Sequence, residues 1–128
     1  MSYDRVAFVG LGLIASSMFW AMRRAGMGAH VTGYARSEQT RATAREIGLC
    51  DTVCDDLASA VRAADLVVLC LPVGAMGEVM AELAPHIKPG ATVTDVGSVK
   101  RAVIEAVAPH VPPGVHFVPG HPLAGTEH

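Results

Sequence analysis

The chain has 128 residues, of which 51% are hydrophobic and 17% are charged, and its formal net charge is −2. This length suits one domain, and the apolar content suffices for a packed core, so a disordered chain is excluded. A weakly acidic chain without a stripe of lysine and arginine is not expected to bind nucleic acid. No apolar run reaches the roughly 18 residues that a membrane span needs, so no membrane partner is expected.

The cysteines and the first residues indicate the compartment in which the protein works. Cys50, Cys54 and Cys70 are an odd number without a Cys-x-x-Cys pair, which predicts neither a disulfide framework nor a metal site. Residues 1–5 have no basic head followed by an apolar stretch, so a secretory signal is not expected. We therefore expect a reduced, cytoplasmic protein.

The first half of the chain alternates short apolar runs with segments of helical period. Residues 5–10 form an apolar run that ends at a glycine, and in residues 13–25 the apolar side chains recur at helical spacing. In order, the predicted elements of this half are a strand at 5–10, a helix at 13–25, a strand at 30–34, a helix at 38–47, a short strand at 52–54 and a brief helix at 57–63.

The second half continues the same alternation. Residues 66–71, Leu-Val-Val-Leu-Cys-Leu, are apolar on both faces, which is typical of a parallel strand covered on both sides. Residues 74–87 carry a strong apolar stripe at helical spacing. In order, the predicted elements of this half are a strand at 66–71, a helix at 74–87, a strand at 92–95, a helix from Ser98 to about 111 and a strand at 116–120.

Strands and helices thus alternate along the whole chain with short connections between them. This order predicts right-handed βαβ units. The expected fold class is α/β, a Rossmann-type doubly wound, mainly parallel sheet with helices on both faces. Residues 1–128 are expected to form one domain, since no linker, repeat or low-complexity tract divides them.

Residues 10–15, Gly-Leu-Gly-Leu-Ile-Ala, lie between the first strand and the first helix, where a dinucleotide-binding fingerprint belongs. In this motif Gly10 permits a tight turn, Gly12 lets a pyrophosphate approach the backbone, and Ala15 lets the helix lie close to the sheet. The helix start offers further phosphate donors, from the backbone and a hydroxyl, at Leu13, Ile14 and Ser16. The alternative is a glycine turn that binds nothing.

The residue that selects the cofactor is expected at the end of the second strand. Sites for NAD usually carry an acid there for the ribose 2′-hydroxyl, but this chain has Ala35. Arg36 and Ser37 could instead hold a 2′-phosphate, which favours NADP and leaves NAD possible. The alternative is a solvated Arg36 and a site that accepts either cofactor. Pro72, which ends the fourth strand, completes the expected cofactor-binding residues.

Two polar segments follow the fifth and sixth strands, and ligands of parallel sheets bind at that edge. The segments are Asp-Val-Gly-Ser-Val-Lys at 95–100, which Thr94 precedes, and Gly-His-Pro-Leu-Ala-Gly-Thr-Glu at 120–127. Together with residues 10–17, Gly-Leu-Gly-Leu-Ile-Ala-Ser-Ser, they resemble the prephenate/arogenate (cyclohexadienyl) dehydrogenases of tyrosine biosynthesis, and this resemblance covers the whole chain. The family often has an aspartate where this chain has Ala35.

The resemblance implies roles for individual residues. His121 contacts the ring 4-hydroxyl of a small-molecule substrate and helps to remove its proton, and Ser98 orients this histidine. Glu127, with its neighbour Thr126, is associated with access to the site. An imidazole is well suited to accept a proton near neutral pH. The alternatives are a structural loop histidine at 121, a simple helix cap at Ser98, and for Lys100 either a substrate contact or a solvated residue.

The resemblance also implies a larger protein. Family members continue into a helical domain that completes the substrate pocket and forms a homodimer, and this domain lies outside the present chain. Arg101 and Lys100 are the nearby cations for a substrate with two carboxylates. The chain alone is therefore expected to bind cofactor and to turn over poorly. The competing hypotheses are another two-domain nicotinamide enzyme, such as a β-hydroxyacid dehydrogenase or imine reductase, and a non-catalytic dinucleotide-binding module.

Overall fold

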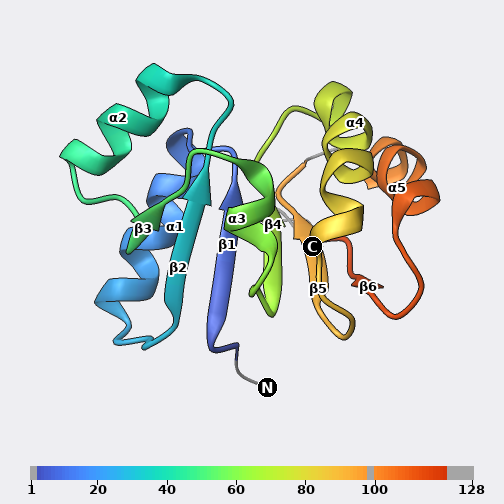
Figure 1. Cartoon of the computed structure of the whole chain (residues 1–128), viewed down its shortest axis with the longest axis horizontal. Helices are drawn as coiled ribbons and strands as arrows, with labels where there is room; N and C mark the ends of the chain where they lie inside the picture. Colours follow the sequence, from blue (N-terminus) through green and yellow to red (C-terminus); the bar gives the residue numbers. More distant parts are fainter. Residues whose placement is uncertain (1–2, 98–99, 121–128) are drawn as a thin grey trace.

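A computed structural model describes residues 3–97 and 100–120 of the chain. These residues contain one sheet of six parallel strands in the order β3-β2-β1-β4-β5-β6 (Figure 1). The strands are β1 (Arg5–Val9), β2 (His30–Tyr34), β3 (Thr52–Val53), β4 (Leu66–Leu69), β5 (Thr92–Asp95) and β6 (His116–Phe117). The α-helices are α1 (Leu13–Arg24), α2 (Glu38–Glu46), α3 (Leu57–Val61), α4 (Val73–Leu83) and α5 (Lys100–Val107).

This strand order confirms the predicted fold class. The chain leaves β1 in one direction to build β2 and β3, then returns across the sheet and continues from β4 in the other direction. The order therefore reverses between β1 and β4, which is the switch point where open parallel sheets bind their ligands. In Figure 1 the arrowheads of β1 and β2 lie at the upper edge of the sheet, opposite the N-terminus.

Two predicted helices end earlier than expected. The helix predicted to reach residue 87 ends as α4 at Leu83, and a 3₁₀ turn, η1 (Ala84–His86), follows it. The helix predicted to reach residue 111 ends as α5 at Val107, before the 3₁₀ turn η2 (Ala108–His110). Each turn contains a proline near its start, and a proline ring removes an N–H donor and clashes with the carbonyl four residues earlier. The two prolines therefore set the ends of these helices.

The core lies on both faces of the sheet. Along β1, Ala7 and Val9 belong to the cluster that α3, α4 and α5 cover, whereas Val6 and Phe8 belong to the cluster of α1 and α2. Successive strand side chains point to opposite faces, so one strand supplies both clusters. Phe8 is fully buried, which stabilises the fold by roughly 1.5–3 kcal/mol. No helix among the described residues is long and apolar enough to cross a membrane.

Candidate functional site

The turn after β1 brings three strand ends together at Gly10. Its φ is +99°, a left-handed conformation that favours glycine. Its N–H donates to the carbonyl of Tyr34 at 2.8 Å, at the end of β2, and a Cβ at this position would overlap the carbonyl oxygen of Cys70. The tight turn expected of the first fingerprint glycine is therefore present, and a larger side chain would not fit.

The second fingerprint glycine faces open space. Gly12 is the N-cap residue of α1, and a Cβ built on it would meet nothing within 4 Å. The helix has no side-chain cap and no acidic residue in its first turn, so its amino end is suited to an anion. Leu13 is 83% exposed at this end, while Ala15 is fully buried against the sheet. These residues fit the cradle that a pyrophosphate needs.

A mostly apolar cavity of about 190 Å³ adjoins this turn. Its walls come from the ends of β1 and β2, from α3 and from α4, and they include Gly10, Tyr34, Ala35, Arg36, Leu57, Leu71, Ala75, Val79 and Glu82. The cavity lies at the switch point of the sheet and could take a flat ring such as adenine. A larger cavity, of about 420 Å³, lies between α1 and β4 and contains no residue of the phosphate turn, so it is not the candidate cofactor site.

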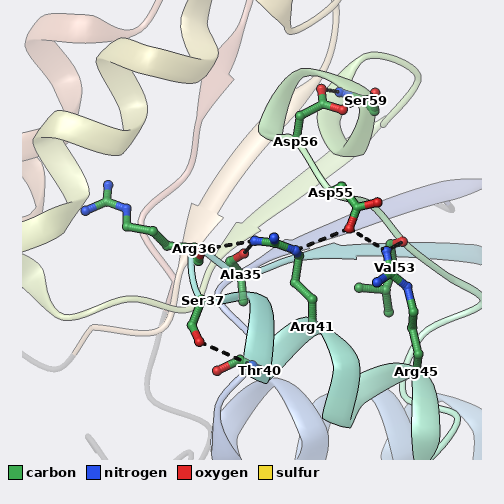
Figure 2. A network of polar contacts seen from close by, with 10 residues as sticks. All are labelled: Ala35, Arg36, Ser37, Thr40, Arg41, Arg45, Val53, Asp55, Asp56 and Ser59. Carbon is green, nitrogen blue, oxygen red and sulfur yellow. Dashed lines mark hydrogen bonds and ion pairs between the residues drawn. The ribbon is translucent and has the colours of Figure 1, made fainter.

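The loop after β2 is held by a polar network on α2 (Figure 2). Arg41 Nη1 donates to the carbonyls of Ala35 at 2.7 Å and Arg36 at 3.0 Å. Arg45 Nη2 donates to Asp55 at 2.8 Å, and the side chain of Ser37 accepts from the backbone N–H of Thr40 and caps α2. The network fixes the backbone at which a ribose would be recognised.

Arg36 takes no part in that network with its own side chain. The side chain is 68% exposed, extends away from Arg41 in Figure 2, and lies 4.0 Å from Glu78 on α4. An exposed pair at this distance contributes little. Of the basic residues 36, 41 and 45, Arg36 is thus the one whose guanidinium can turn to a new anion.

The fifth strand ends in a buried carboxylate that sequence reasoning missed. The side chain of Asp95 is fully buried, and Lys100 Nζ lies 2.7 Å from its Oδ2. Lys100, whose side chain is 27% exposed, also donates to the carbonyl of Gly97. It is therefore more than a solvated residue of the first helical turn, and a substrate carboxylate would compete with Asp95 for it. The signal in the sequence was an acid at a buried position of an alternating strand, since Asp95 lies two residues after Val93 and therefore on the same face.

The other expected catalytic residues lie outside the described part of the chain. These are Ser98, His121, Thr126 and Glu127. Their described neighbours are Gly97 and Gly120, which both bond to Asp95. Pro72 is the N-cap residue of α4, three residues after β4 ends at Leu69, and its carbonyl accepts from Ala75 N at 2.9 Å. Its contact with the cofactor stays a prediction.

The cysteines are not prepared for nucleophilic chemistry. Burial raises the pKa of Cys50 and of Cys70 to about 12, so both are protonated thiols at neutral pH. Burial also raises the pKa of Cys54. All three are free, and the described residues contain no cluster of His, Cys, Asp and Glu that could hold a metal ion.

The strand order, the phosphate turn and the adjoining cavity define a Rossmann-type dinucleotide-binding domain. Residues 19–128 match the family described as "Prephenate dehydrogenase, nucleotide-binding domain". The chain belongs to this family, which confirms the resemblance seen in its motifs.

Relatives of known name agree with this family. The chain is 46% identical over 125 residues to a cyclohexadienyl dehydrogenase of Zymomonas mobilis. The aligned region covers 98% of this chain and 42% of that protein. Its structure matches an arogenate dehydrogenase of Synechocystis with a TM-score of 0.79 at 36% identity, over 97% of this chain and 42% of that one. It also matches the prephenate dehydrogenase of A. aeolicus in complex with hydroxyphenyl propionate and NAD+, with a TM-score of 0.78 at 29% identity, over 100% of this chain and 44% of that one.

Proposed function

We propose that the full-length protein is an NAD(P)-dependent dehydrogenase that oxidatively decarboxylates prephenate, arogenate or both, and that this chain is its cofactor-binding part. The observation that carries the proposal is that two features share the carboxyl edge of one parallel sheet. An open phosphate turn follows β1, and the two family-specific segments follow β5 and β6. Relatives that match most of this chain are named cyclohexadienyl, prephenate and arogenate dehydrogenase.

The residues present fit a nicotinamide dinucleotide. The amino end of α1 with Gly12 would hold the pyrophosphate, and the cavity beside Ala35 would hold the adenosine. When bound, the nicotinamide supplies a hydride acceptor. The chain itself must remove the hydroxyl proton of the substrate, a task that we assign to His121 with Ser98 as the group that orients it. Loss of CO₂ then leaves an aromatic ring, which makes the reaction nearly irreversible.

The rest of the protein is proposed to form a helical domain that completes the substrate pocket and pairs two subunits. The chain spans 42% of the length of the Zymomonas relative, so most of such a protein lies beyond the present residues. A substrate with two carboxylates needs cationic partners. In the described part of the site, Lys100 is already paired with Asp95, so further cations are expected from that second domain.

The test of the proposed reaction is His121→Asn in the full-length enzyme. Asparagine keeps a hydrogen-bonding side chain but cannot act as a base near neutral pH, so kcat should fall by roughly 10²–10⁴-fold. The affinity for cofactor should stay unchanged. The wild-type rate should rise with pH through an apparent pKa of about 6.5, and the variant should lose this rise. A variant with normal kcat, or with the same pH dependence, would show that another group is the base.

We further propose that NADP binds at least as tightly as NAD. The support is the missing acid at Ala35 and the exposed guanidinium of Arg36, which is followed in the chain by Ser37. Arg36→Ala should weaken NADP binding by about tenfold or more, the loss of a charge-assisted hydrogen bond, and leave NAD binding unchanged. Fluorescence titration of wild type and variant with both cofactors measures this. A tenfold preference of the wild type for NAD would overturn the proposal.

A further inference from the structure

The buried carboxylate of Asp95 connects two segments that are far apart in the sequence. Its Oδ1 accepts a hydrogen bond from Gly120 N at 2.9 Å, just beyond β6. Its Oδ2 accepts from Gly97 N at 2.7 Å and from Lys100 Nζ at 2.7 Å, at the start of α5. Each oxygen thus holds the backbone of a different segment, and the lysine supplies the compensating charge.

Both backbone partners are glycines that leave no room for a side chain. A Cβ at Gly120 would overlap the carbonyl oxygen of Asp95 and lie 2.9 Å from Thr94 Oγ1. A Cβ at Gly97 would lie 2.7 Å from Val103 Cγ2 and 3.2 Å from Asp95 Oδ2. The two segments therefore lie directly against the end of β5, and their places depend on this contact.

Fold stability alone does not require such an arrangement. A buried ion pair contributes little net stability compared with apolar residues of similar volume, although removing one partner is costly. What the arrangement provides is a defined position for two loops at the edge where the ligands of parallel sheets bind. Gly97 directly precedes Ser98 in the chain, and Gly120 directly precedes His121.

We propose that Asp95 is a positioning residue for the reaction: through its two oxygens it holds together the segments that lead into Ser98 and His121. The proposal rests on the proposed function, since it assumes that these two residues act on the substrate. Asp95 itself need not touch the substrate. It determines where the two segments leave the sheet, and a reacting group displaced by about 1 Å can cost roughly 100-fold in rate.

Asp95→Asn in the full-length enzyme is the direct test. Asparagine has the same shape but one acceptor oxygen, so it cannot accept from both Gly97 and Gly120. We expect kcat to fall by roughly 10–100-fold while the Kd for cofactor stays within about twofold. The rise of the rate with pH should remain, because the base is still present. Faster amide exchange at Gly97 or Gly120 should accompany the loss.

Asp65→Asn is the matched control. Asp65 accepts from the backbone N–H groups of Asp4 at 3.1 Å and Arg5 at 2.9 Å, and pairs with Lys88 Nζ at 2.6 Å. It has the same kinds of partner as Asp95, but it lies at the opposite edge of the sheet, before β4. Its substitution should lower the melting temperature and leave kcat unchanged. Equal kcat losses in the two variants would overturn the positioning role.

A second variant keeps the test decisive if Asp95→Asn does not fold. Gly120→Ala retains the Asp95 carboxylate, but the added Cβ would overlap the carbonyl oxygen of Asp95 and push the segment that follows β6 away from β5. This variant should again lower kcat without changing the affinity for cofactor. Gly28→Ala is its control, since a Cβ there meets nothing within 4 Å. Normal kcat in Gly120→Ala contradicts the inference. The two proposals fail under different results. If His121→Asn keeps the wild-type kcat, the proposed function is wrong. If His121→Asn loses activity while Asp95→Asn keeps the wild-type kcat, only the positioning role of Asp95 is wrong.

Discussion

Two glycines two residues apart in the phosphate turn have different physical requirements. Gly10 is needed by the fold, because its φ is +99° and a Cβ would overlap the carbonyl oxygen of Cys70. Gly12 has no such constraint: its φ of −94° and ψ of −159° are open to other residues, and its surroundings are empty. The fold therefore does not require a glycine at position 12, and the space beside it is open to the approach of a pyrophosphate, the role that we propose for the second glycine of this motif.

Gly12→Val should separate folding from binding. The branched side chain fits the extended backbone, so the melting temperature should change little, but its methyl groups occupy the space that a pyrophosphate must enter. The Kd for NAD(P) should rise by at least about 100-fold, a loss of about 2.7 kcal/mol. Fluorescence titration and thermal unfolding measure the two quantities. Gly10→Ala, the control, should instead unfold at a lower temperature. An unchanged Kd in the valine variant would place the cofactor elsewhere.

At the scale of elements, the sequence was most informative where the signal is local. The alternation of apolar runs and helical periods predicted the six strands and their parallel direction, since a helix between two strands returns the chain to the edge where the first strand began. The ends of α4 and α5 were predicted too late, although Pro85 and Pro109 were visible. Apolar side chains at helical spacing, Ile87 and Val111, continue beyond these prolines, so the helical pattern alone predicts later ends than the structure has.

In the candidate site, too, features built from contiguous residues could be predicted, and features built from residues distant in the sequence could not. The phosphate turn could be predicted because its residues are contiguous and each has a fixed place in the motif. The role of Asp95 could not, because its bond to Gly120 joins positions 25 residues apart and exists only once β5 and β6 are adjacent. The cavity wall was missed for the same reason, since Leu57 and Ala75 come from two different helices.

At the scale of the whole molecule, two carboxylates, those of Asp51 and Asp65, bind the amino ends of strands at the edge of the sheet opposite the candidate site. Asp51 accepts from Val31 N at 2.7 Å and pairs with Arg23, while Asp65 accepts from Arg5 N and pairs with Lys88. The bond from Lys88, followed by that from the backbone of Arg5, lowers the pKa of Asp65. Burial alone would raise the pKa of Asp51, but its hydrogen bonds from Val31 and Arg23 outweigh burial and lower it.

These lowered pKa values predict that the domain loses stability in acid. A carboxylate whose folded pKa lies below its unfolded value of about 3.9 contributes fully above that value, and its contribution is lost as the pH falls through the folded pKa. The free energy of unfolding, measured by denaturant titration, should therefore decrease from pH 5 toward pH 2. Asp51→Asn should cost about 1 kcal/mol at pH 7, a modest figure because the side chain is 35% exposed and its pair is screened by solvent. At pH 2 the difference from wild type should nearly vanish, because both side chains are then neutral. A difference that stays constant with pH would mean that asparagine disturbs packing rather than charge.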